Sequence, residues 1–146
     1  MARGDVQIFE EALAYLIDGD FASTDDIKCG IVTNAVVPTA ADAAPSFVDY
    51  TEVTDAGTYT AGGTSLGNLT TCVSEAGGTM TFDSATNPTW AQDDDNGETA
   101  YYAIIYNDDD ANDLCIAFID LGGPVDMSGG DLTISWADGT GIFTIS

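Results

Sequence analysis

The side chains that could do chemistry in this chain are almost all carboxylic acids. The sequence holds 25 Asp and Glu residues, two basic residues, Arg3 and Lys28, and no His. Without His there is no imidazole to act as a general base, and two cations offer little to bind a phosphate or to activate a nucleophile. These residue types favour a binding or structural protein over an enzyme, and we expect no catalytic residue, no cofactor and no metal centre.

Glycoside hydrolysis is one reaction that needs only two carboxylic acids at a fixed separation. With 25 acids, the sequence gives no reason to select one pair. The short strands expected below also offer no scaffold for a deep sugar cleft. A glycosidase is therefore disfavoured.

Two runs of aspartate resemble cation sites. Residues 93–97 read Asp-Asp-Asp-Asn-Gly, like the opening of an EF-hand loop, but the twelfth position from Asp93 is Ile104, where an EF-hand needs a bidentate Glu. The second run supplies hard oxygen ligands without a recognisable spacing. It consists of Asp108, Asp109, Asp110 and Asp113. We interpret the first run as no EF-hand and the second as a solvated loop, with adventitious binding of Ca²⁺ or Na⁺ as the alternative.

Neither the cysteines nor an N-terminal tripeptide indicates a site. The three cysteines lack C-x-x-C spacing, and each lies in a segment with the pattern of a strand, which predicts small core residues rather than metal ligands or a disulfide. They are Cys29, Cys72 and Cys115. Arg3-Gly4-Asp5 spells an integrin-type tripeptide, but a match of three residues carries almost no information.

The charge limits the partners that the protein can have. A formal net charge of -23 repels nucleic acid and anionic membranes and favours basic or cation-rich surfaces. Repulsion of this size is screened near 1 M salt, so we expect the melting temperature to rise with NaCl up to about that concentration. A saline environment is one interpretation, and an acidic surface that keeps a concentrated protein in solution is the other.

The length and hydropathy predict one domain over residues 1–146 with one substantial core. No apolar run approaches the roughly 18 residues of a membrane span, so neither a signal peptide nor an anchor is expected. Residues 5–18 predict an amphipathic helix, with Asp5 as its cap and Gly19 at its end. Its apolar stripe consists of Val6, Phe9, Leu13, Leu16 and Ile17. We expect this stripe to cover the core, so that Leu13→Ala lowers the melting temperature by many degrees.

The rest of the chain predicts strands. Residues 26–33 alternate with a period of two, and residues 34–68 read as a long irregular passage with prolines and paired glycines. Further strands are expected at residues 69–74, 79–82, 101–106, 114–121, 131–136 and 142–145. Together they predict a mainly β fold, an antiparallel β-sandwich of jelly-roll-like or Ig-like type with one N-terminal helix. Residues 114–119 are apolar on both parities, which predicts a central strand that pairs with residues 101–106 and is covered on both faces.

The tyrosines of the 101–106 strand are candidates for binding. Tyr101, Tyr102 and Tyr106 fall on both parities, so at least one is expected at the outer face or edge. There it would be a packed lid or an interface anchor. Burial of all three within the domain is the alternative.

Several short motifs, taken in order, resemble a family of small virion structural proteins of tailed phages and related viruses. The motifs are D-I-K-C-G-I-V-T at 26–33, Y-T-A-G-G-x-x-L at 59–66, P-T-W at 88–90, Y-A-I-I-Y at 102–106, I-D-L-G at 119–122, G-x-L-T-I-x-W at 130–136 and G-I-x-T-I at 141–145. The resemblance spans most of the chain. One departure is Tyr101, which stands where the family usually has a basic residue.

The resemblance implies a non-enzymatic protein of the virion, made in the host cytoplasm. Its expected place is the outer capsid surface, where it would bind the major capsid protein shell as a decoration or cement protein and assemble as a homotrimer, with no nucleic acid and no membrane as partner. Two alternatives stay open. One is a tail fibre or tail-tip component that recognises a host surface, and the other is a free-standing cation- or carbohydrate-binding module.

Overall fold

The computed structural model describes residues 4–84, 86–95, 98–136 and 141–146. The chain is mainly β, its strand pairs are antiparallel and one helix lies near the N-terminus, so the predicted fold class is confirmed. Among the described residues, no helix is long and apolar enough to cross a membrane.

Ten strands of the described residues form three sheets. The main sheet has the order β1-β8-β7-β2-β3, the second sheet β10-β5-β4, and the third pairs β6 with β9. The main strands are β1 (Val6–Ile8), β2 (Asp26–Val32), β3 (Thr64–Asn68), β7 (Thr99–Asn107) and β8 (Cys115–Asp126). The shorter strands are β4 (Val73–Ala76), β5 (Thr79–Phe82), β6 (Thr89–Trp90), β9 (Leu132–Thr133) and β10 (Phe143–Ile145). The helices are α1 (Ala12–Asp18) and α2 (Leu69–Cys72), with 3-10 turns η1 (Phe47–Asp49) and η2 (Met127–Gly129).

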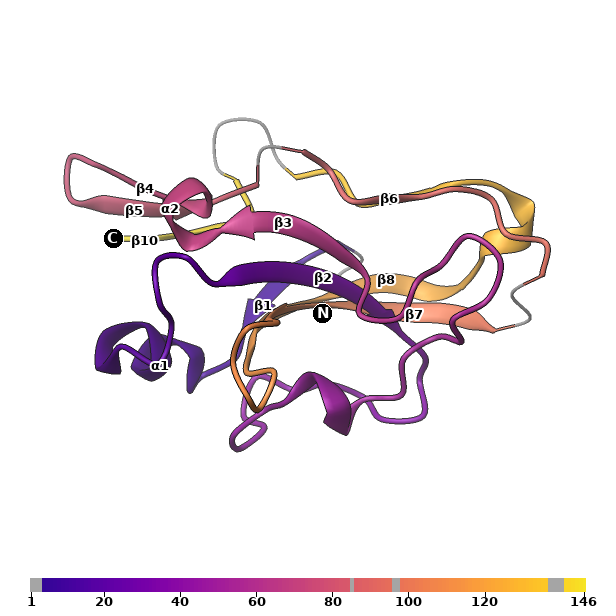
Figure 1. The fold of residues 1–146 in the computed structure, drawn as a ribbon, viewed down its shortest axis with the longest axis horizontal. Helices are drawn as coiled ribbons and strands as arrows, with labels where there is room; N and C mark the ends of the chain where they lie inside the picture. Colours follow the sequence, from indigo (N-terminus) through magenta and orange to yellow (C-terminus); the bar gives the residue numbers. More distant parts are fainter. Residues whose placement is uncertain (1–3, 85, 96–97, 137–140) are drawn as a thin grey trace.

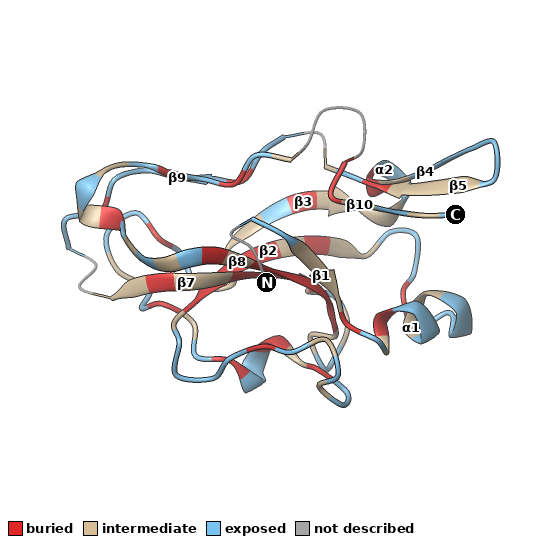
Figure 2. Ribbon diagram, turned by 180° about the vertical axis from the view of Figure 1, so that it is seen from behind, coloured by how far each residue is buried: buried red, intermediate tan, exposed pale blue. Residues whose placement is uncertain are grey.

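The main sheet lies between two other layers. In Figure 1 the two smaller sheets lie above it, and α1 and residues 34–50 lie below it. Residues 115–119 of β8 are all buried, as are residues 103–107 of β7, so both parities of these strands face protein (Figure 2). The predicted pairing of these two strands and the covering of both faces are confirmed.

The N-terminal helix is shorter than predicted. Residues 6–8 form strand β1, in which Val6 pairs with Ile119 and Ile8 with Ala117, and the helix begins only at Ala12. The reason is that two β-branched residues at alternate positions fit the open edge of β8 better than a helical turn. Asp5 therefore does not cap the helix, whereas Gly19 ends it as expected, in a left-handed conformation with φ 83°.

The apolar stripe of that helix is also divided differently. Phe9 is fully buried and precedes the helix, while Leu13 is 39% exposed and Ile17 is 83% exposed. The prediction that Leu13 is a core residue is wrong. The lower face of the main sheet is covered instead by Phe9 and by residues 34–50, whose Tyr50 contacts the Phe9 ring at a centroid distance of 6.3 Å.

Three further segments differ from the prediction. Residues 69–72 form α2 instead of a strand, because the Asn68 side chain accepts a hydrogen bond from the Thr71 N–H and caps the turn. Cys72 thus ends a helix, although all three cysteines are buried and unpaired as expected for core residues. Residues 64–68, predicted as irregular, form β3, and the predicted strand at 131–136 is reduced to β9.

Candidate functional site

The cysteine thiols, which are reactive groups in many other proteins, are buried in this fold. Burial raises the pKa of the Cys29 thiol to about 12 and also raises that of Cys115, where nearby carboxylates add to the effect. A thiol must ionise to act as a nucleophile or a metal ligand. Within the described part of the chain, no three Cys, Asp or Glu side chains are grouped so that they could hold a metal ion.

Many carboxylates brace loops by accepting hydrogen bonds from backbone N–H groups. Several of these bonds join segments far apart in sequence, such as Glu98 Oε2 with the Thr54 N–H at 2.6 Å. Other long-range acceptors are Glu11 for Ala44, Asp93 for Thr58 and Tyr59, Asp109 for Asp26, and Asp131 for Gln92. The acids therefore hold the irregular connections in place, which is a structural use and not a catalytic one.

Asp93 shows this use most clearly. Its side chain is only 2% exposed, and it accepts hydrogen bonds from the N–H groups of Thr58, Tyr59 and Asp95. The 93–97 run, predicted not to be an EF-hand, thus begins with a buried brace, and Asn96 and Gly97 lie outside the described residues. Arg3 of the tripeptide also lies outside them.

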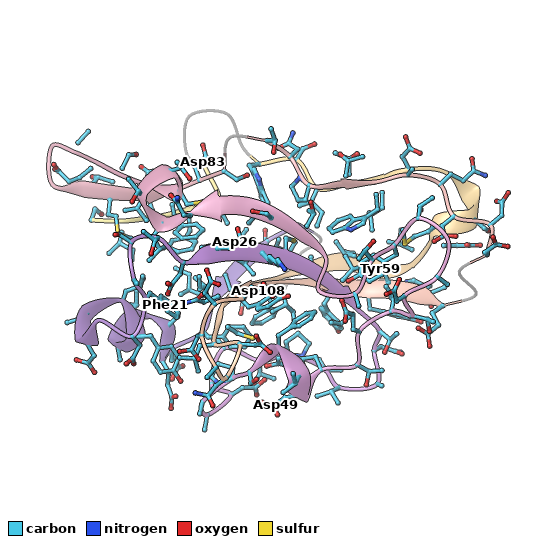
Figure 3. The ribbon with its side chains drawn as sticks, viewed as in Figure 1. Phe21, Asp26, Asp49, Tyr59, Asp83 and Asp108 are labelled. Atoms are coloured by element: carbon cyan, nitrogen blue, oxygen red, sulfur yellow. The ribbon has the colours of Figure 1, made fainter. Side chains whose placement is uncertain are left out.

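The second aspartate run is bound into the fold. Lys28 Nζ lies 2.6 Å from Asp108 Oδ2, Asp109 accepts from the Asp26 N–H, and Asp110 accepts from the Asn112 N–H. Figure 3 labels Asp26 and Asp108 in this region. Asp113 differs from these three. Burial, and then the charges of Asp108 and Asp110, raise the pKa of its carboxyl, although Lys28 acts in the opposite direction. Asp113 is therefore the acid of this run whose ionisation opposes folding.

We expect Asp113→Asn to raise the melting temperature by a few degrees at neutral pH and low salt. The raised pKa means that the folded state resists ionisation, so the wild type loses stability as pH rises through that pKa and regains it below. Asn removes the charge and tolerates the left-handed φ of 48° at this position. Thermal melts of both proteins check this, and the difference should shrink near 1 M NaCl and at acid pH. An unchanged difference at 1 M NaCl would mean that burial, and not the charges of Asp108 and Asp110, accounts for the effect.

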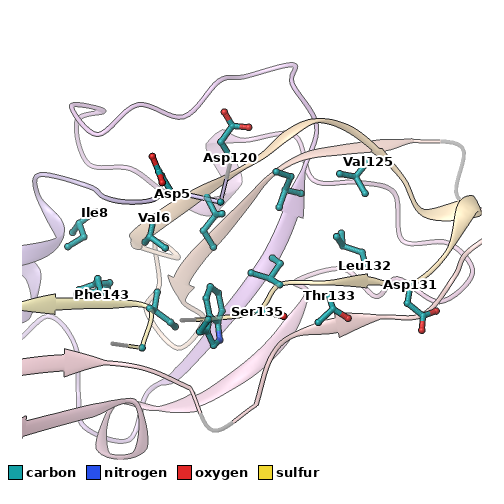
Figure 4. A pocket seen from close by; sticks show the side chains of 17 residues that line it. Asp5, Val6, Ile8, Asp120, Val125, Asp131, Leu132, Thr133, Ser135 and Phe143 are labelled. Carbon is teal, nitrogen blue, oxygen red and sulfur yellow. The ribbon is translucent and has the colours of Figure 1, made fainter. Parts of the chain in front are cut away.

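A cavity of about 740 Å³ lies between the main sheet and the two smaller sheets above it. Figure 4 shows Val6, Val125, Leu132 and Phe143 around it, with Asp5 and Asp120 at one side and Asp131 at another. Asp120 accepts from the Gly122 N–H and Asp131 from the Gln92 N–H, so both carboxylates serve the backbone. The walls of the cavity are polar and apolar in about equal parts.

A second feature is an apolar surface on the lower side of the molecule, below the main sheet in Figure 1. We call it the loop patch. It consists of the exposed residues Val36, Val37, Ala43, Ala44 and Val48. Val48 is 75% exposed and Val37 54% exposed, values that are high for branched apolar side chains.

Two shallow hollows flank the 42–49 segment that carries part of this patch. One, of about 690 Å³, is lined by Tyr15, Ala44 and Val48, and the other, of about 300 Å³, by Val36, Val37 and Pro45. Asp49 lines both hollows. The two groups of apolar residues therefore lie on either side of Asp49.

The loop patch is held rigidly from beneath. The Phe47 ring stacks on the Tyr106 ring at a centroid distance of 4.2 Å and an interplanar angle of 1°, directly over Gly30. Ser46 bridges to Leu114, and the Cys115 N–H donates to the Pro45 carbonyl. Val48 is therefore an exposed residue next to the buried Phe47, in a segment that these contacts fix in place.

Asp42 fixes the other end of this segment. Its carboxylate accepts hydrogen bonds from the N–H and hydroxyl of Thr39 and from the Tyr50 hydroxyl. Burial tends to raise the pKa of Asp42, but these bonds outweigh it and hold the pKa below its ordinary value. The carboxylate therefore stays ionised at neutral pH and keeps the 39–50 segment closed.

The three tyrosines that the sequence indicated as candidates for binding differ in how far they are buried. Tyr106 is buried under Phe47, while Tyr101 and Tyr102 are half-buried.

The loop patch was not predicted from sequence, although one signal was present. Among the 22 residues at positions 27–48, only Asp42 is acidic, in a chain that otherwise carries acids throughout.

Comparisons with known proteins leave the resemblance to virion proteins as a prediction. No family model, no curated protein and no solved structure matches the chain.

Proposed function

We propose that this protein is a non-enzymatic structural component that binds another protein assembly, and that the assembly is the outer surface of a tailed-virus head. In that role it would be a capsid decoration protein. The observation that carries the binding role is the loop patch, an exposed apolar surface fixed on a braced scaffold. Exposed apolar side chains gathered on a fixed segment typically mark a contact with another protein.

The choice of a virion head as the assembly is supported by the sequence motifs of residues 26–145. The acidic surface agrees with it, because a body of charge -23 suits a position that faces solvent and is separated from packaged DNA. The use of carboxylates as loop braces and the burial of the thiols support a structural role over an enzymatic one. A homotrimer is part of this proposal, since three-fold and quasi-three-fold positions of a shell match a closed cyclic trimer.

The copy number on purified particles tests the proposal. We expect hundreds of copies per particle by quantitative mass spectrometry, arranged in threes in density maps of the head. A count between three and a few dozen would place the protein in the tail, as a fibre or tail-tip component. A protein that is absent from particles, and that binds a glycan or melts in a calcium-dependent way as a monomer, would contradict any virion role.

A further inference from the structure

The surroundings of the loop patch indicate what kind of surface it fits. The hollow beside Val48 is bordered by four acids, and the hollow beside Val36 and Val37 by two. These acids are Asp20, Asp49, Asp110 and Asp113 in the first hollow and Asp42 and Asp49 in the second. An apolar centre with a charged rim is the usual anatomy of a protein interface, and here the rim has one sign.

The rim charges are not balanced within the described part of the chain. Lys28 is the one Lys or Arg there, and its ammonium is bonded to Asp108. A partner that approaches the patch therefore meets a negative potential around an apolar centre. Electrostatic complementarity then requires positive charge on the partner.

A second copy of this chain related by a two-fold axis fits this surface poorly. A two-fold contact places the same patch of each copy face to face, so it would bring the same acids together. Like charges held at an interface cost several kcal/mol. The acids of the rim thus exclude self-pairing through this patch at moderate salt, whereas they attract a basic surface.

The backbone beneath the patch is set in a conformation that only the surrounding structure maintains. Ala44 and Asp113, with φ values of 46° and 48°, are the two non-glycine residues with positive φ among those described, and both line the hollow beside Val48. Such conformations persist where the fold over-determines them, and they gather at binding sites. A surface prepared in this way loses little conformational entropy when it binds.

We propose that the loop patch is the surface that docks on the capsid shell, and that its partner is an apolar protein surface bordered by Lys or Arg side chains. This inference rests on the proposed function, because the shell is taken as the partner. It adds which face of the protein makes the contact and which chemistry the shell presents there.

The test is rebinding of recombinant protein to particles of the encoding virus that were assembled without it. We expect the wild type to bind, with an affinity that falls as NaCl rises from 0.1 to 0.5 M. Val48→Asp should weaken binding by at least about tenfold, because it places a charge in the apolar centre. Asp110→Asn should weaken it by about two- to fivefold and reduce its salt dependence, because it removes one rim charge and keeps the acceptor for the Asn112 N–H.

Ile17→Asp is the matched control. Ile17 is 83% exposed on α1 and lines neither hollow, and its replacement adds the same charge as Val48→Asp. We expect this variant to bind within twofold of the wild type. Melting curves should show that both variants fold, since both side chains lie largely in solvent.

The outcomes separate the two proposals. If the wild type fails to bind particles, the proposed function is wrong and the docking surface falls with it. If the wild type binds but Val48→Asp binds equally well, or Ile17→Asp loses as much, the function stands and the surface is wrong. Binding that strengthens with salt contradicts a basic partner. Self-association of the free protein that Val48→Asp abolishes would assign the patch to a second copy instead.

Discussion

Replacing Phe9 by Ala is expected to lower the free energy of unfolding by about 3–5 kcal/mol, a large share of the stability of one domain. Phe9 has no exposed surface, and its ring packs on Phe118 at a centroid distance of 5.0 Å and on Tyr50 at 6.3 Å. It therefore joins the lower layer to strand β8 of the main sheet. Urea unfolding monitored by circular dichroism measures the change.

Leu13→Ala is the control for Phe9→Ala. Leu13 lies four residues later in the same stripe and is 39% exposed, so its truncation leaves no closed cavity and should cost under about 1.5 kcal/mol. Equal losses for the two variants would mean that α1 packs more tightly than the structure shows. A small loss for Phe9→Ala would contradict its placement between the layers.

Gly63→Ala is expected to be among the most damaging changes of a single methyl group in this chain. The backbone at Gly63 has φ +73°, and a Cβ there would lie 2.0 Å from the Cys29 carbonyl oxygen and 2.6 Å from the Gly30 Cα. The neighbours are backbone atoms of β2, so they cannot turn aside as a side chain would. We expect the entry into β3 to be displaced and the pairing of Cys29 with Thr64 to be lost.

Gly78→Ala separates the clash from the backbone conformation. Gly78 also has a left-handed backbone, with φ +85°, but a Cβ there would meet nothing within 4 Å. In both variants an alanine in the left-handed backbone region lowers the free energy of unfolding by about 1–2 kcal/mol. Gly63→Ala loses about 1–3 kcal/mol more, because its Cβ overlaps the backbone of β2. Thermal or urea unfolding of both proteins checks this, and equal stabilities would show that β2 yields at Gly63.

The sequence predicted best the elements whose residues carry a period of their own. Residues 79–82 alternate between two turns and form β5 at the predicted positions. Residues 114–119 are apolar on both parities, which is what a strand covered on both faces requires, and residues 115–119 lie in β8 beside β7. Local pattern and tertiary environment agree in these segments, so periodicity was sufficient.

The segments that were predicted wrongly depend on partners far away in the chain. Val6 and Ile8 fit a helical stripe by spacing, and only the open edge of β8 makes them a strand. The exposure of the loop patch also depends on residues far away in the chain. Phe47 is buried and Val48 exposed because Tyr106 stacks on Phe47, and no pattern around residue 47 shows that contact.

Two kinds of interaction stabilise the molecule and respond to different conditions. One is apolar packing between the sheets, and the other is hydrogen bonding to carboxylates in the connections. Packing between the sheets is apolar and indifferent to protons, whereas the bonds of Asp42 with Thr39 and Tyr50 use carboxylate oxygens that lose acceptor capacity when protonated, which happens as the pH falls through the lowered pKa of Asp42. Acid would thus weaken the hydrogen bonds that hold this connection, while the packing between the sheets would remain. Since Asp42 closes the 39–50 segment, which carries Ala43, Ala44 and Val48 of the loop patch, acidity would change the shape of the binding face independently of the stability of the core.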